Sequence, residues 1–100
     1  MLFRSREIPI KQAQAVLKRV VKETAHQRTR LLTKKKDRSL IVATGDGTLT
    51  LVEQGYVNAR QTYHLAGRAA KHAVTTAFKR EFPRSHRVYL SQTKEGHDAG

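Results

Sequence analysis

The sequence predicts a single α+β domain with the element order helix, strand, strand, helix, strand. Three observations predict it: an early apolar pattern of helical period, two β-rich runs joined by Gly45-Asp46-Gly47, and a second helical pattern that stops at Pro83. We expect a three-stranded, mainly antiparallel sheet with both helices packed on one face. Residues 1–9 are expected to be an irregular lead-in, residues 10–93 the domain, and residues 94–100 a disordered tail.

The first helix is expected over residues 10–32. Pro9 is favourable just before or within the first turn of a helix. Apolar residues then recur at steps of three and four, from Ala13 to Leu32. The basic run at residues 34–38 is expected to end this helix.

A β-hairpin is expected over residues 39–53. Residues 39–44 and 48–53 are rich in β-branched and aliphatic side chains. Gly and Asp between them tolerate the positive φ angles that tight hairpin turns need. The first run is apolar on both faces and is therefore expected to be the more central strand.

The second helix is expected over residues 58–82. Asn58 followed by Gln61 fits a capping box, and Pro83 cannot continue the helix. Its small residues suit close packing on a sheet. Residues 86–91 then alternate like a strand, which we expect to pair with the hairpin.

The charge of the chain is its strongest functional signal. The formal net charge is +12. It divides into +9 for residues 1–38, −2 for residues 39–59, +7 for residues 60–94 and −2 for residues 95–100. A charge so unevenly distributed favours a dedicated surface for a polyanion, and nucleic acid is the commonest such partner.

Two sets of basic residues are candidates for that surface. The second predicted helix carries a row at spacings of three and four, which we expect to form one stripe: Arg60, His64, Arg68, Lys71, His72, Thr75 and Lys79. The second set is the loop cluster Lys34, Lys35, Lys36 and Arg38. Arg87, which is near Tyr89 on the third strand, could extend either set. Because a hairpin separates the two helices, a helix-turn-helix is not indicated, and RNA or DNA backbone recognition is favoured.

Two other functions stay open. The lean core and Ala-rich helix would suit a protein–protein interaction or assembly module, which forms a homodimer or binds an acidic partner. A small ribonuclease that needs no metal is the second alternative, with Arg60, Tyr63, His64 and His86 as the residues that could act on a phosphate. A non-enzymatic role is favoured, and no catalytic residue is assigned.

Several classes of function find no support in the sequence. The chain has no Cys, which excludes disulfides and thiolate metal sites. Its five His residues form no metal-ligand pair at helical or strand spacing, so neither a metal nor another cofactor is expected. No signal peptide is expected from the first residues, and no apolar run approaches the ~20 residues that span a bilayer. We therefore expect a cytoplasmic protein without membrane contact.

Overall fold

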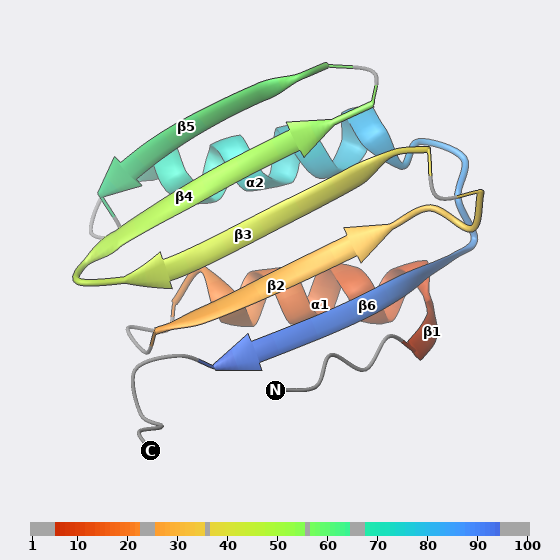
Figure 1. The fold of residues 1–100 in the computed structure, drawn as a ribbon, viewed down its shortest axis with the longest axis horizontal. Helices are drawn as coiled ribbons and strands as arrows, with labels where there is room; N and C mark the ends of the chain where they lie inside the picture. Colours follow the sequence, from red (N-terminus) through yellow and green to blue (C-terminus); the bar gives the residue numbers. More distant parts are fainter. Residues whose placement is uncertain (1–5, 23–25, 36, 56, 65–67, 95–100) are drawn as a thin grey trace.

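The computed structural model describes residues 6–22, 26–35, 37–55, 57–64 and 68–94 of the chain. Six strands and two helices follow one another in this part of the chain (Figure 1). Their order is β1 (Arg6–Pro9), α1 (Ile10–Val20), β2 (Gln27–Leu32), β3 (Ser39–Gly45), β4 (Thr48–Gln54), β5 (Ala59–His64), α2 (Arg68–Glu81) and β6 (Arg87–Lys94).

All six strands form one sheet in the order β1-β6-β2-β3-β4-β5, and every neighbouring pair is antiparallel. Both helices lie on the same face of this sheet, and no described element covers the other face (Figure 1). The α+β class fits, but the predicted three-stranded sheet is wrong. The reason is that two segments predicted as helix, and one predicted as irregular, are strands.

The first predicted helix is wrong beyond Val20, where α1 ends. Residues 27–32 form β2 instead, between β3 and β6. Gln27, Thr29 and Leu31 point inward and are buried, so two of the three inward positions are polar. Thr29 Oγ1 accepts a hydrogen bond from Gln92 Nε2 at 3.1 Å, which satisfies this buried hydroxyl. Because its apolar residues do not alternate, the hydrophobic pattern of the segment did not indicate a strand.

The second predicted helix is wrong at its start. Residues 59–64 form β5, and α2 begins only at Arg68. Asn58 does not cap a helix, because its Oδ1 accepts the N–H of Gly55 at 3.3 Å and so closes the turn that follows β4. β5 carries polar side chains on both faces, which hides its period of two.

Other parts of the prediction are confirmed. The predicted hairpin is β3 and β4, and its turn contains Asp46 and Gly47 at φ values of 55° and 75°. The predicted last strand corresponds to β6, and Pro9 is the N-cap residue of α1. Arg6–Pro9, however, was expected to be irregular and instead pairs with β6. Residues 95–100 of the expected tail lie outside the described residues.

The core lies between the helices and the sheet. Each helix contributes one apolar side, and the sheet contributes large residues from its central strands. The buried residues include Ala13, Val16, Leu17 and Val20 of α1, Ala70, Val74, Ala77 and Phe78 of α2, and Leu31, Leu40, Leu49 and Val88 of the sheet. Neither helix in this described part of the chain is long and apolar enough to cross a membrane.

Gly55 closes the turn after β4 in a space that admits no side chain. Its φ is +131°, and an added Cβ would lie 2.6 Å from Arg38 Cγ and 2.9 Å from Glu81 Oε1. Gly55→Ala is expected to lower the free energy of unfolding by about 3 kcal/mol, because the left-handed backbone and the clash both cost energy. Gly47→Ala is the matched control: φ is +75° with no atom within 4 Å, so only the backbone cost of about 1 kcal/mol applies. Equal losses in urea unfolding of the two variants would contradict the expected clash.

Candidate nucleic-acid interface

The predicted basic stripe is divided between the two faces of the molecule. Arg68, Lys71, His72 and Lys79 lie on α2 and are exposed. Arg60 and His64 were predicted on the same helix but lie on β5. Arg60 pairs with Val52 in the register, on the sheet face opposite to the helices. The stripe is therefore wrong for its first two members, because the segment that carries them is a strand.

The exposed charges on the two helices are all positive. α1 carries Lys11, Lys18 and Arg19 and has no acidic residue. α2 carries four basic residues, and its one carboxylate belongs to Glu81, which is 1% exposed. Of the four, Arg80 is held by the buried Glu53 carboxylate. The outer side of the helix layer is therefore a cationic surface, and the described residues of the two helices expose no acidic side chain on it.

A groove runs between α1 and α2, which lie antiparallel behind the sheet (Figure 1). We call it the interhelical groove. Its volume is ≈ 220 Å³, and its charged lining consists of Lys18 from α1 and of Lys71 and Lys79 from α2. Leu17, Val21, Val74 and Phe78 supply its apolar lining. Lysine side chains can cover such a surface with their methylene chains and present the ammonium groups to an anion.

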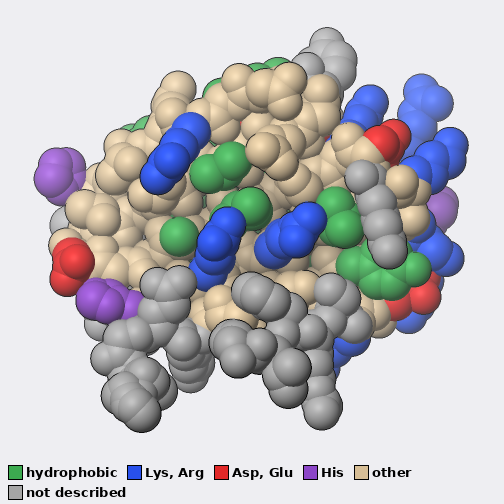
Figure 2. Space-filling view, viewed as in Figure 1, with side chains coloured by type: hydrophobic (Ala, Val, Ile, Leu, Met, Phe, Trp, Pro, Cys, Tyr) green, Lys and Arg blue, Asp and Glu red, His purple; other side chains and the backbone are tan. Residues whose placement is uncertain are grey.

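A second basic hollow, the end cleft, lies where the β2–β3 loop meets the α2–β6 loop. Its volume is ≈ 690 Å³, and its basic lining residues are Lys34, Lys35, Arg38, Arg84, His86 and Arg87. Figure 2 shows Lys and Arg side chains gathered at this end of the molecule. The structure thus brings the predicted Lys34–Arg38 cluster together with Arg87, which is far away in the sequence; Lys36 lies outside the described residues.

Local hydrogen bonds and ion pairs fix the walls of the end cleft. Thr33 Oγ1 donates to Asp37 Oδ1 at 2.7 Å and closes the loop that carries the lysines; this bond lowers the pKa of Asp37. Glu7 Oε2 lies 2.9 Å from Lys34 Nζ and 3.3 Å from Arg87 Nε. The hydrogen bond from Lys34, with a smaller contribution from Arg87, lowers the pKa of Glu7. Glu7 therefore joins the loop to β6, and Lys35 and Arg84 form no ion pair with a described carboxylate.

The groove and the cleft are linked by a third hollow, whose one basic lining residue is Lys79. Its volume is ≈ 370 Å³, and it is lined by residues of both. It shares Phe78 and Lys79 with the interhelical groove, and Pro83 and Ser85 with the end cleft. We call these three linked hollows the basic track.

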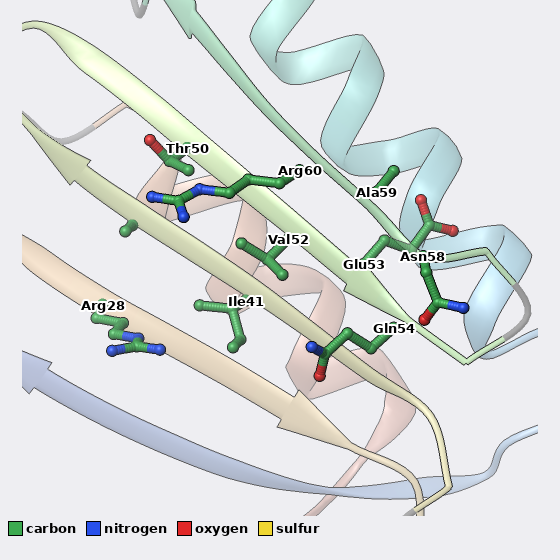
Figure 3. Close-up of a pocket in the computed structure, with 10 residues that line it drawn as sticks. Arg28, Ile41, Thr50, Val52, Glu53, Gln54, Asn58, Ala59 and Arg60 are labelled. Atoms are coloured by element: carbon green, nitrogen blue, oxygen red, sulfur yellow. The ribbon is translucent and has the colours of Figure 1, made fainter.

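The uncovered sheet face carries a third group of cations, of which the sequence analysis singled out only Arg60 and assigned it to a helix. Arg28 and Arg30 of β2 and Arg60 of β5 are exposed there. Figure 2 shows separate Lys and Arg side chains between hydrophobic ones on this face, and Figure 3 shows Arg28 and Arg60 on either side of Ile41 and Val52. The alternation of arginine in Gln27–Leu32 could have indicated a strand with a basic outer face.

The residues proposed for a ribonuclease do not meet. His64 ends β5 at one edge of the sheet, whereas His86 precedes β6, and β2, β3 and β4 lie between these strands. Strands are about 4.8 Å apart, so β5 and β6 are separated by roughly 19 Å. Tyr63 also lies on the helix side, next to His72, and thus on the other face from Arg60. Among the described residues, no three His, Asp or Glu side chains form a group that could hold a metal ion.

Comparison with known proteins gives no functional lead. No family model, no curated protein and no solved structure matches this chain. Its function is therefore inferred from the charge and geometry of its own residues.

Proposed function

We propose that this protein binds the phosphate backbone of RNA or DNA along the basic track, without catalysis. The observation that carries the proposal is the interhelical groove with its lysines, in a helix layer whose exposed charges are all positive. Cationic side chains in such an array can neutralise phosphates of a nucleic acid. The counterions that these phosphates held are then released, and this release favours binding.

The spacing of the groove lysines suits a repeating anion. Lys71 and Lys79 are eight residues apart on α2, which is about 12 Å along the helix axis. Lys18 faces them from α1. Duplex DNA carries a charge about every 1.7 Å along its axis, so several phosphates lie within reach of these ammonium groups. Lysine contacts a phosphate as a point charge, and such contacts carry no information about base sequence.

Charge reversal in the groove tests the proposal. The variant Lys18→Glu/Lys71→Glu is expected to weaken binding of a 16-base-pair duplex about 30-fold at low salt, and to reduce the log–log salt slope by about 2. Fluorescence anisotropy of labelled DNA and RNA duplexes over a salt series measures both quantities, and the two arms compare the nucleic acids. Circular dichroism melting checks that the variant is folded.

Arg28→Glu/Arg30→Glu is the matched control, because it changes the net charge equally on the opposite face. It is expected to weaken binding less than threefold, through the long-range field alone. Equal losses in the two variants would show general attraction without a binding face. No binding of the wild-type chain at low salt would refute the proposal.

The ribonuclease is not proposed, because its residues lie on separate parts of the fold. The homodimer and the cytoplasmic location stay predictions; light scattering of the chain with and without an oligonucleotide tests the first. The acidic protein partner is favoured by one specific observation, the uncovered sheet face.

A further inference from the structure

The uncovered sheet face has an ordered cross-strand pattern. One row of neighbours reads Arg30 on β2, Ile41 on β3, Val52 on β4 and Arg60 on β5. The adjacent row reads Arg28, Ala43, Thr50 and Thr62, and the last two are joined by a hydrogen bond at 3.2 Å. On this face β3 and β4 therefore present a floor of Ile41, Ala43, Val52 and Thr50, and the strands that flank this pair, β2 and β5, present arginines.

These arginines have no partner within the described chain. Arg28, Arg30 and Arg60 are exposed and form no ion pair with a described carboxylate. Glu53 lines the same hollow (Figure 3), but Arg80 holds its carboxylate with hydrogen bonds of 2.7 and 2.9 Å. The charge on this face is thus available to an acidic partner.

The dimensions of the face suit an α-helix. Three strand spacings of about 4.8 Å place the Cα atoms of Arg30 and Arg60 roughly 14 Å apart. An α-helix with side chains is about 10–12 Å wide, which is comparable with this Cα separation. Arg28 and Arg30 are about 7 Å apart along β2, close to the 6 Å between residues i and i+4 of a helix that lies along the strands.

The floor of this face favours a helix over the other occupants. Bases of single-stranded nucleic acid bind by stacking on aromatic rings, and the floor consists of Ile41, Ala43, Val52 and Thr50. A second copy of this face would bring arginines against arginines, which repel. An apolar helix stripe with acidic flanks matches both the floor and the rims.

We propose that the uncovered sheet face binds an acidic amphipathic helix of a partner protein, with its apolar stripe on Ile41, Ala43 and Val52. Carboxylates on one flank pair with Arg28 and Arg30, and carboxylates on the other pair with Arg60. The helix layer stays accessible on the opposite side. This second surface is independent of the proposed nucleic-acid binding.

The probe is a synthetic 20-residue peptide with Leu at helical i, i+3, i+4 and i+7 positions and Glu on both flanks. Binding is measured by anisotropy, and its site by NMR shifts of the full chain labelled with ¹⁵N. We expect shifts centred on β3 and β4. Arg28→Glu/Arg60→Glu is expected to raise the Kd about tenfold or more, whereas Lys18→Glu/Lys71→Glu should change it less than threefold.

A sequence-scrambled peptide of identical composition has the same charge but lacks the apolar stripe, so it tests whether charge alone causes binding. A single-stranded deoxythymidine 20-mer tests whether this face binds nucleic acid instead of a helix. Weaker binding of the scrambled peptide supports the proposal. It is overturned if the helical peptide does not bind, if both peptides bind equally, or if the shifts fall on α1 and α2. It is also overturned if the oligonucleotide, rather than the peptide, depends on Arg28 and Arg60. Loss of duplex binding alone would refute only the nucleic-acid function.

Discussion

Replacing Arg80 by alanine is expected to lower the free energy of unfolding at pH 7 by about 2–3 kcal/mol. Arg80 Nε and Nη2 donate to the two carboxylate oxygens of Glu53 at 2.7 and 2.9 Å. The Glu53 side chain is 4% exposed, so the substitution leaves a buried carboxylate without this cation. Arg80 is itself 37% exposed, which keeps the expected loss below that of a fully buried pair. Thermal unfolding should shift downward by roughly 10–20 °C.

The pH dependence has a definite sign. The hydrogen bonds from Arg80 lower the pKa of Glu53 from its ordinary value of 4.5. The ion pair of Glu53 with Arg80 therefore stabilises the wild-type fold at pH values above 4.5. That stability is lost as the pH falls through the lowered pKa. In Arg80→Ala the main cause of this lowering is gone and burial raises the pKa of Glu53, so the variant should lose less stability than the wild type as the pH falls from 7. Melting at pH 7 and pH 4.5 should show the difference between the two proteins narrowing.

A double variant distinguishes the lost ion pair from lost packing. Glu53→Gln/Arg80→Ala removes the buried charge together with its cation and is expected to be more stable at pH 7 than Arg80→Ala alone. If the double variant were less stable than the single variant, burial of the Glu53 carboxylate would not be the cause of the loss.

The sequence predicts those elements of this fold in which the buried positions are occupied by apolar residues. The hairpin, the start of α1 after Pro9, and the last strand are of this kind. β2 and β5 were not predicted because several side chains on their helix-facing sides are polar. Gln27 and Thr29 of β2 are buried, and Gln61 of β5 faces the helices, only because neighbouring strands place them there. Period-two alternation cannot be recognised when both faces of a strand are polar.

The candidate site was predictable where its residues lie within one helix or one loop, as Lys34, Lys35 and Arg38 do. Lys71 and Lys79 follow from helical spacing on α2 alone. The end cleft could not be predicted, because Lys34 and Arg87 meet only through the placement of β6 beside β2 and β1. The placement of Arg60 on the opposite face is likewise a consequence of tertiary structure, since its segment pairs with β4.

A variant that reverses charges along the whole basic track is expected to bind duplex roughly a thousandfold more weakly than wild type at low salt. It combines Lys18→Glu and Lys71→Glu in the groove with Lys35→Glu and Arg84→Glu in the end cleft, and its salt slope should fall by about 4. Lys35 and Arg84 are chosen because neither is ion-paired with a described carboxylate. Their replacement should therefore leave the contacts of Glu7 with Lys34 and Arg87 intact.

Ligand length then tests whether the groove and the cleft bind one molecule. The protein is 35 Å in its longest dimension, and a 12-base-pair duplex is about 40 Å long, whereas a 5-base-pair hairpin stem covers about 17 Å. The longer ligand can reach both hollows and should be sensitive to both pairs of substitutions. The short stem should be sensitive to the groove pair alone if it binds there. Equal sensitivity of the short and long ligands to Lys35→Glu/Arg84→Glu would mean that the short ligand binds at the cleft itself, and that the cleft is a separate anion site.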